Sequence, residues 1–590
     1  MRSSLLGPLL LALASSPVLA QTPRSPVEID GDVQATTAFA GLATSGDLTA
    51  AQFTAGTSAV GQPSEIYVTF SDGRGLDWST PRRVDGGTSL QNRFVPSEPG
   101  EAIAVEGDSI YVVWADQRAS MGSSQSDVYF ARSMDRGLTF EPELRLDFGA
   151  PQGVQRTSWI SLEVVGSDVY VLVATDLTGG SDNGLYLLRS NDGGASFGQP
   201  QTLSSMSGSS TSVLYAGLEC LGSTVVAVWL DDRTAPNSFA SDVFFRVSND
   251  GGTSFGPETR PNGSAVGTSR FGKVQGAIVG STIFITWWEE TLGLQGYDLR
   301  GVLSVDDGQT FGPDFRVGNA APASSSALRS DVAIVGGALL TTQRDGGSPP
   351  YGVIVSRSTD LGLTWIDTEV MPEGPEPQFA WTDRDPTESS IGVVASVTQF
   401  SPLEWQTSLV ASRDGGASWS SPTLISAATS ADLSLNPVLN SRYDNFIVGR
   451  GESFSTGPAT VTNVIACGLR PQTAQLSSRV SGSIASFDLR GWEPGTTRFV
   501  WVFGSNSMSG LPVSALGGRL LGLALDGLFN VTLLSPATFL TPLDASGSGA
   551  TGSFLLNLPP GSTFFQAAVS FDVGPITAVE ISDAVEVTVQ

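Results

Sequence analysis

The sequence predicts an all-β protein: a β-propeller, with eight blades favoured and seven as the alternative, followed by a C-terminal β-sandwich. Three observations predict it. A short turn motif recurs along most of the chain, alternating apolar segments flank each copy, and 102 of the 590 residues are Gly or Pro, from 68 Gly and 34 Pro. Frequent turns with few charged residues (15%) favour many short strands over long solvated helices.

The turn motif reads Ser-x-Asp-x-Gly-x-(Thr/Ser)-(Phe/Trp), and its six intact copies are centred on Asp135, Asp192, Asp250, Asp306, Asp360 and Asp414. These positions are separated by 57, 58, 56, 54 and 54 residues. A decayed seventh copy runs from Ser71 to Trp78, with Gly73 in the place of the Asp. In a hairpin turn the Asp accepts main-chain N–H groups and Gly supplies a positive φ. We expect the Phe or Trp to fill the gap between neighbouring units.

A second pattern recurs before each motif, and it places a Gly, then a Trp or Gln, then an acid at constant offsets. The four sets are Gly107/Trp114/Asp116, Gly222/Trp229/Asp231, Gly280/Trp287/Glu289 and Gly336/Gln343/Asp345. Each unit therefore holds four strands, and radially repeated four-stranded units are propeller blades. The last set, Leu433 to Cys467, lacks a fourth strand. We expect the segment Pro26–Asp30 to supply that strand and to close the ring.

These motifs resemble the Asp-box (BNR) repeat of sialidase-like propellers, over residues 27–467. The resemblance implies that the six Asp residues are structural, in turns between the third and fourth strands. Sialidases of this family bind the substrate carboxylate with three Arg and use a Tyr nucleophile paired with Glu, and an Asp acid. Their early Arg-Ile-Pro motif is matched here only by Arg93-Phe-Val-Pro96, which has one residue too many. Tyr297 and Tyr351 are the candidate tyrosines, and neither has an obvious Glu nearby.

Three segments follow from this pattern. Residues 1–20 read as a signal peptide, with Arg2, an apolar stretch from Leu5 to Ala14 and a small-residue cleavage site ending at Ala20. Residues 27–467 form the propeller and residues 470–590 the β-sandwich. The sequence thus predicts a secreted protein, extracellular or periplasmic, with no membrane span.

Composition excludes several kinds of chemistry. The chain has no His, which removes Ser-His-Asp and Cys-His nucleophiles and His-ligated zinc. Cys220 and Cys467 fall in opposite blades, so we predict two separate thiols. A net charge of −27 argues against a nucleic-acid partner. No cofactor is expected; calcium is conceivable but nothing indicates it.

The candidate ligand-binding residues lie on the side opposite the motif turns, where second strands end and new blades begin. They are Arg93, Arg156, Arg270, Arg329, Asp116, Arg118, Asp231, Arg233 and Glu289. Two interpretations of the Arg residues stay open: an anion site, or a repeated clamp in which each Arg pairs with an Asp of a neighbouring blade. The acids could be a general acid/base pair, calcium ligands or solvated rim residues. Trp287-Trp288 could supply a sugar-stacking ring.

Two functions remain open from the sequence. The first is a secreted, non-catalytic propeller that binds a glycan or an extracellular protein through this side. The alternative is an exo-sialidase or related glycoside hydrolase with diverged motifs. No residue is identified as catalytic, and the oligomeric state is not predicted.

Overall fold

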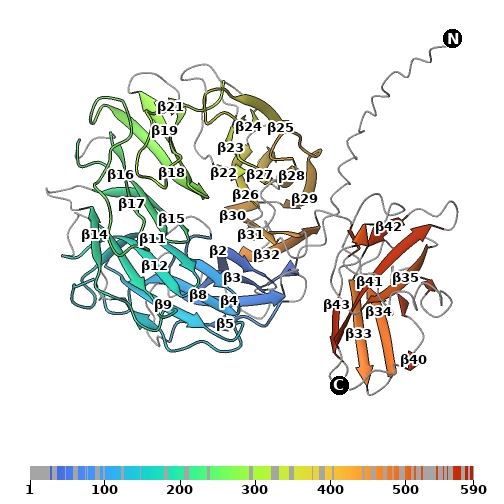
Figure 1. Cartoon of the computed structure of the whole chain (residues 1–590). Helices are drawn as coiled ribbons and strands as arrows, with labels where there is room; N and C mark the ends of the chain where they lie inside the picture. Colours follow the sequence, from blue (N-terminus) through green and yellow to red (C-terminus); the bar gives the residue numbers. More distant parts are fainter. Residues whose placement is uncertain are drawn as a thin grey trace, which may run out of the picture. The chain divides into compact units, whose positions relative to one another are not determined.

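In the computed structural model the chain divides into two compact units, Thr22–Leu469 and Arg470–Gln590 (Figure 1). The structure describes residues 27–468 apart from loops, chiefly 30–35, 57–63, 87–92, 121–124, 179–183, 205–211, 236–239, 292–296, 320–330, 345–350, 385–391, 441–444 and 454–459. Between 475 and 588 it describes the strands alone. Side chains are described for most residues from 29 to 371 and from 408 to 424.

Every regular element in the described part of the chain is a β-strand. The first unit contains these sheets, in chain order. Sheet 1 comprises β2 (Thr36–Ser45), β3 (Leu48–Gly56), β4 (Ser64–Asp72) and β5 (Arg82–Arg83). Sheet 2 comprises β6 (Arg93–Phe94), β7 (Ile103–Glu106), β8 (Ser109–Asp116), β9 (Asp127–Ser133) and β10 (Leu144–Arg145). Sheet 3 comprises β11 (Arg156–Val165), β12 (Asp168–Asp176), β13 (Gly184–Ser190) and β14 (Gln201–Ser204).

Five further sheets follow. Sheet 4 comprises β15 (Val213–Leu221), β16 (Thr224–Asp231) and β17 (Asp242–Ser248). Sheet 5 comprises β18 (Ser269–Val279), β19 (Thr282–Thr291), β20 (Asp298–Ser304) and β21 (Phe315–Arg316). Sheet 6 comprises β22 (Asp331–Val335), β23 (Ala338–Arg344), β24 (Tyr351–Ser358) and β25 (Ile366–Gly374), and sheet 7 comprises β26 (Pro377–Arg384), β27 (Gly392–Ser401), β28 (Glu404–Ser412) and β29 (Thr423–Ala428). Sheet 8 comprises β30 (Ser430–Asn440), β31 (Asn445–Ser453), β32 (Thr460–Gly468) and, from the start of the chain, β1 (Val27–Glu28).

The sheets follow one another in a closed order. The first long strand of each sheet contacts that of the next, in the sequence β2, β7, β11, β15, β18, β22, β26, β30 and back to β2 (Figure 1). Sheet 8 takes its fourth strand from the beginning of the chain, because β1 pairs antiparallel with β32, Val27 opposite Val464. This is the pairing predicted for Pro26–Asp30. It joins the two ends of the first unit by main-chain hydrogen bonds.

Two sheets depart from the predicted four consecutive strands. In sheet 2 the first strand is split into β6 and β7, which both pair with β8. In sheet 4 the fourth strand is reduced to one bridge between Phe245 and Thr259. Pro261 lies two residues after Thr259, where sheet 2 has Leu146, whose N–H donates to the Val128 carbonyl at 2.9 Å. A Pro has no N–H to make this bond.

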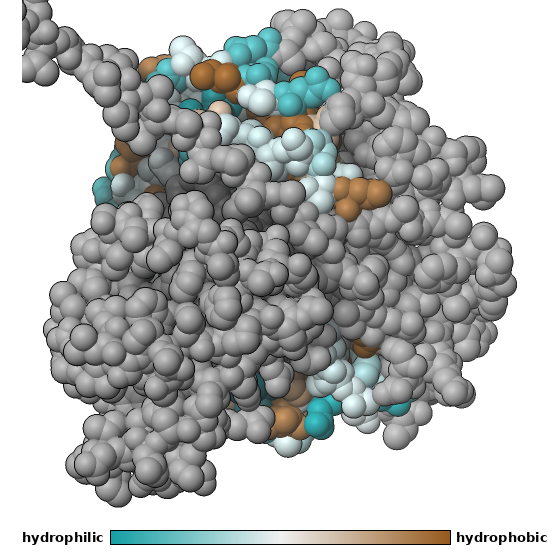
Figure 2. All heavy atoms as spheres, turned by 90° about the vertical axis from the view of Figure 1, so that its right-hand side faces the viewer, coloured by the Kyte–Doolittle hydropathy of each residue, from teal (hydrophilic) through white to brown (hydrophobic). Residues whose placement is uncertain are grey.

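The core lies between successive sheets. The middle strands are buried on both faces, as in β8, where all eight residues are buried. The aromatic residue of each motif packs on the preceding sheet, as predicted for a residue that fills the gap. Phe197 lies 5.0 Å from Phe130 and Phe311 lies 4.5 Å from Phe245, measured between ring centroids. On the side of the molecule shown in Figure 2, the coloured residues are a mixture of apolar and polar ones.

The six motif turns share one hydrogen-bond pattern. In the turn of sheet 4, the Ser248 hydroxyl donates to Asp250 at 2.7 Å and accepts from Gly252 N–H at 2.9 Å. The Ser254 N–H and hydroxyl donate to the two Asp250 oxygens at 2.8 and 2.6 Å. These donors, led by the Ser254 hydroxyl, lower the pKa of Asp250 to about 2. The turns at Asp135, Asp192, Asp306, Asp360 and Asp414 repeat the same four bonds.

The second unit is also built from strands in its described residues. One sheet joins β33 (Gln475–Ser481), β34 (Ile484–Arg490), β39 (Gly549–Ala550) and β40 (Phe554–Leu555). Another joins β35 (Arg498–Ser505), β38 (Leu540–Pro542), β41 (Thr563–Asp572), β42 (Ala578–Ile581) and β43 (Val585–Thr588), and β36 (Leu511–Pro512) pairs with β37 (Leu520–Leu521). Within the part of the chain that was described, no helix is long and apolar enough to span a membrane.

Candidate functional site

The predicted residues that the structure describes lie at one end of sheets 2 to 5, which we call the loop end. Here the second strand ends and the first strand begins, and the motif turns lie at the opposite end. In sheet 2 the loop end is centred on Asp116, which is 1% exposed at the end of β8. Its Oδ2 accepts from Arg93 Nε at 2.9 Å and from Arg118 Nη2 at 2.5 Å. Arg93 is itself 1% exposed, so this pair is sealed from solvent.

Arg118 extends this network across the sheet. Its guanidinium donates to Glu143 Oε2 at 3.0 Å and lies 4.2 Å above the centre of the Tyr129 ring. Burial disfavours the charge on Arg118, but hydrogen bonds to Glu143 and Asp116 outweigh burial and raise its pKa. The loop after the second strand is thereby fastened to the third and fourth strands of the same sheet.

Sheet 4 repeats this clamp at identical spacing. Arg233 binds Asp231 at 2.5 Å and Glu258 at 3.0 Å, and its guanidinium lies 4.3 Å above the Phe244 ring. The four positions stand at the same offsets in both sheets, 116/118/129/143 and 231/233/244/258. The indole N–H groups also match, since Trp114 donates to Asp116 at 3.4 Å and Trp229 donates to Asp231 at 2.9 Å.

Sheet 5 builds a similar clamp from a different position. Glu289 is buried at the end of the second strand, and its cation is Arg300, at 3.4 Å, from the third strand instead of the loop. Arg300 Nε also donates to Asp314 at 2.8 Å. Trp287 and Trp288 are both almost fully buried, so neither can stack on a sugar, contrary to the expectation from the sequence. Among the described residues, the Trp287 indole N–H has no hydrogen-bond partner.

A second acid–Arg pair, eighteen residues apart in the chain, fastens the third strand to the fourth at the same end. The pairs are Glu65–Arg83, Asp127–Arg145 at 3.1 Å, Asp242–Arg260 at 2.6 Å and Asp298–Arg316 at 3.1 Å. Asp127 and Asp242 stand directly opposite Asp116 and Asp231 in the ladder. Each carboxylate of such a facing pair therefore has its own Arg, which offsets the repulsion between them.

The four predicted Arg residues do not have equivalent surroundings. Arg93 is buried against Asp116, and Arg270, on β18, lies 3.6 Å from Glu290. Arg156 is exposed at the start of β11 and forms no ion pair with another described residue. Arg329 and Asp345 lie outside the described residues. Arg93 and Arg270 pair with acids of their own sheets, and Arg93 also lies 3.6 Å from Asp85, which follows β5 of sheet 1. Among the described Arg residues, a pair within the sheet and a contact with the neighbouring sheet therefore occur together at Arg93.

The other predicted residues are also placed. Tyr297 is half-buried against the core between sheets 5 and 6, and the Tyr351 side chain lies outside the described ones. Cys220 is a free thiol on β15 of sheet 4, whereas Cys467 belongs to β32 of sheet 8, with its side chain outside the described set. Burial, reinforced by Glu163 and Glu219, raises the pKa of the Cys220 thiol.

Two aromatic residues at the loop end were missed by the sequence analysis. The ladders of sheets 3 and 4 are bulged at Ser158 and Leu214, so exposed Ser158 and Leu214 are each followed by a half-buried aromatic residue. Those residues, Trp159 and Tyr215, lie 4.9 Å apart between ring centroids. The signal in the sequence is an aromatic residue four positions before a Glu, at Trp159/Glu163 and again 56 residues later at Tyr215/Glu219.

Three carboxyl groups lie on or just before the first strands of sheets 2, 3 and 4, and they belong to Glu101, Glu163 and Glu219. Burial is the main cause that raises the pKa of Glu163, and the nearby charges of Glu219 and Glu101 add to it. A Cβ placed on Gly276 of β18, the first strand of sheet 5, would lie 3.0 Å from Glu219 Cγ. Among the described residues, no acidic or Cys side chains are grouped as a metal site requires.

No protein-family model and no curated protein matches the sequence. Solved structures of similar fold include a family 25 polysaccharide lyase, an ulvan lyase, at 11% identity and a TM-score of 0.41, covering 62% of this chain and 91% of that one. An α-L-arabinanase of Penicillium chrysogenum (13%, TM-score 0.33, 62% and 91% covered) and a Hadza microbial sialidase (15%, TM-score 0.32, 56% and 71% covered) are also similar. These are carbohydrate-active enzymes, but the scores are too low to carry an argument about activity.

Proposed function

We propose that Thr22–Leu469 is an eight-bladed, sialidase-like Asp-box propeller of a secreted protein, which binds a glycan or an extracellular protein through its loop end without catalysis. We propose further that Arg470–Gln590 is a β-sandwich. The blade assignment is supported by the closed order of the first strands and by the β1–β32 pair. The observation that carries the functional proposal is that most of the described candidates are already engaged in ion pairs within the fold, namely Arg93, Arg118, Arg233, Asp116, Asp231 and Glu289.

A sialidase needs three Arg side chains that point at one substrate carboxylate. Of the candidates, Arg93 is buried against Asp116. Arg118 and Arg233 each bind two carboxylates. These three cations therefore already have partners within the fold. Releasing a buried Arg from its carboxylate would leave an unpaired buried charge, which costs several kcal/mol.

The binding surface in this proposal is the loop end of sheets 3 and 4. It combines the exposed Arg156 with Ser158, Leu214 and the half-buried Trp159–Tyr215 pair. Partly exposed aromatic rings beside a cation can stack on a sugar ring or anchor a protein partner. Both ligand classes therefore stay within the proposal.

Hydrolysis of a fluorogenic sialoside by the full-length chain tests the absence of catalysis, with Arg270→Ala measured in parallel. We expect no release of fluorophore above the blank from either protein. Release by the native chain that Arg270→Ala abolishes would establish the sialidase and overturn the non-catalytic proposal.

Glycan-array and plasma-protein pull-down binding test the surface. For the ligand so found, we expect Arg156→Glu and Leu214→Asp each to weaken binding about tenfold or more. The matched controls are Arg82→Glu, at an exposed position of β5, and Leu424→Asp, at an exposed position of β29. Equal loss in the controls would contradict the assignment of the surface.

A further inference from the structure

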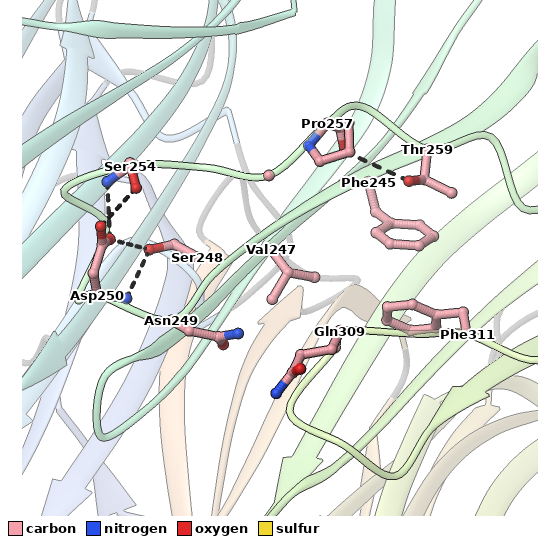
Figure 3. Close-up of a pocket in the computed structure, with 12 residues that line it drawn as sticks. Phe245, Val247, Ser248, Asn249, Asp250, Ser254, Pro257, Thr259, Gln309 and Phe311 are labelled. Atoms are coloured by element: carbon pink, nitrogen blue, oxygen red, sulfur yellow. Dashed lines mark hydrogen bonds between the residues drawn. The ribbon is translucent and has the colours of Figure 1, made fainter.

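A groove of about 550 Å³ lies at the opposite, turn end of the first unit, between the motif turns of sheets 4 and 5. Figure 3 shows Val247 between the two turns, with Phe245 and Phe311 beside it. The groove belongs to neither the ion-pair clamps nor the aromatic pair at the loop end. It therefore needs its own explanation.

One residue position distinguishes this groove from the corresponding places after sheets 2, 3 and 6. The residue just before the Ser of the motif is Arg in sheets 2, 3 and 6, and each of these Arg side chains bridges to the motif turn of the next sheet. Arg132 donates to the Gly193 carbonyl at 2.5 Å, Arg189 to the Thr253 hydroxyl at 2.9 Å and Arg357 to the Gly415 carbonyl at 2.7 Å. In sheet 4 this position is Val247, whose side chain is too short to bridge.

The surroundings of the motif Gly in the next sheet support the comparison between Val247 and the bridging Arg residues. A Cβ placed on Gly194 would lie 3.6 Å from Arg132 Cδ, and one on Gly416 would lie 3.5 Å from Arg357 Cδ. A Cβ on Gly308 would instead lie 2.8 Å from a methyl group of Val247. Val247 thus occupies the start of the path that an Arg follows in the other sheets, and the rest of that path is the groove.

The groove has an apolar floor and a polar rim, in which Asp250 is the charged residue of the described lining. Phe245 is 2% exposed and packs against Phe311 at a centroid distance of 4.5 Å, so the accessible floor consists of the half-buried Phe311 and Val247 and the exposed Pro257. Asn249 and Gln309 are exposed on the two turns. Asp250, the acid in the lining, has both carboxylate oxygens engaged by Ser248 and Ser254.

We propose that this groove is a binding site for a neutral saccharide of one or two rings. Its volume lies in the range of small-ligand sites. Carboxamides donate and accept at once, as vicinal sugar hydroxyls require, while the apolar floor suits the C–H face of a sugar ring. Asp250 is the charged residue in the described lining, and its carboxylate would repel an anionic ligand, which favours a neutral one. The site goes beyond the proposed function, because it lies at the other end of the sheets.

Saturation-transfer NMR and calorimetry with cellobiose, maltose and lactose on the full-length chain test the proposal. Val247→Arg rebuilds the bridge that three other sheets already contain, so we expect it to fold with an unchanged melting temperature and to weaken binding about tenfold or more. Gln309→Ala, at an exposed position, should weaken binding in the same direction and covers the case in which Val247→Arg unfolds the protein. Asn191→Ala is the control, since Asn191 is an exposed carboxamide residue in the turn of sheet 3 and is not part of the groove lining.

The outcomes separate cleanly. Binding that is lost in Val247→Arg and Gln309→Ala, but kept in Asn191→Ala and Arg156→Glu, supports the groove independently of the loop end. No binding of any of the three disaccharides to the native chain overturns the proposal, as does binding that Val247→Arg leaves unchanged. Binding of a capped tripeptide at the same residues, with the sugars inert, would assign the groove to peptides instead.

Discussion

At the scale of single residues, the motif turns work because one carboxylate accepts several short hydrogen bonds in an exposed position. In the turn of sheet 5, Asp306 accepts from the Thr310 hydroxyl and N–H and from the Ser304 hydroxyl at 2.6 to 2.9 Å. Donors in this arrangement, first among them the Thr310 hydroxyl, lower the pKa of Asp306 to about 2. The pKa values of Asp135, Asp192, Asp360 and Asp414 are lowered as well.

These shifts predict acid sensitivity with a definite sign. An Asp has a pKa of about 3.9 in the unfolded chain, so a lower value in the fold adds stability above that pH and loses it as the pH falls toward about 2. We expect the melting temperature to fall steeply between about pH 4 and pH 2. Calorimetric scans of the native chain and of the double variant Asp250→Asn/Asp306→Asn should show a shallower slope in the variant. Parallel slopes would contradict the role of these turns.

Leu361 carries a local conformational cost. Its φ is +61°, in the left-handed region, whereas three sister turns have Gly at the same position, at Gly193, Gly251 and Gly415. The side chain is also 53% exposed, so little packing offsets the strain. A non-Gly residue in this region costs roughly 1–2 kcal/mol.

We therefore expect Leu361→Gly to stabilise the protein by about 1 kcal/mol, measured by urea unfolding. Gly415→Leu, the reverse change in the turn of sheet 7, should destabilise it. A Leu361→Gly variant that is less stable than the native chain would show that Leu361 makes a contact that outweighs its backbone strain.

At the scale of elements, the clamps replace long fourth strands. β10 and β21 are only two residues long, and sheet 4 has a single bridge in that place. In sheets 2 and 4 the Asp116–Arg118–Glu143 and Asp231–Arg233–Glu258 networks connect the second strand to the fourth position through side chains. Side-chain hydrogen bonds thus fasten the fourth-strand segment to its sheet, where the main-chain ladder is too short to do so.

Arg118→Met tests the strength of one clamp. It keeps much of the volume but leaves Asp116 buried with fewer donors, so we expect a loss of about 3 kcal/mol in the free energy of unfolding. Arg136→Met is the control, because Arg136 pairs with the exposed Asp108 and a surface pair contributes less than about 1 kcal/mol. Similar losses in both variants would mean that the clamp adds no more than a surface ion pair.

At the scale of the whole first unit, closure depends on two residues from the beginning of the chain. β1 pairs through Val27 and Glu28 with Val464 and Asn463 of β32. Without it, β32 would present an unpaired strand edge, and such edges pair with other chains.

A chain that starts at Gly31 should therefore melt at a lower temperature and associate, whereas one that starts at Gln21 should stay like the native protein. Differential scanning calorimetry measures the first effect and light scattering measures the second. Equal melting temperatures and sizes for the two chains would show that β1 is dispensable for closure.

Local sequence determined much of this protein. The six turns, their hydrogen-bond acceptors, the packing role of the motif aromatic residue and the return of Pro26–Asp30 to the last sheet could all be predicted, because each depends on a residue pattern within one unit or on counting units. The sequence also marked Asp116 and Asp231 by their repeated spacing, and it placed Arg118 and Arg233 among the candidate residues at the same end of the sheets.

Only the tertiary structure decided what those residues do. Whether Arg93 and Arg118 are free to bind a ligand depends on which carboxylates meet them, and Glu143 lies 25 residues beyond Arg118 in the chain. The meeting of Trp159 with Tyr215, and the groove that Val247 leaves open, each involve two sheets at once. Spacing along a chain determines the hydrogen bonds inside a turn. Ion pairs and cavities depend instead on residues that lie far apart in the chain and meet only when the sheets pack.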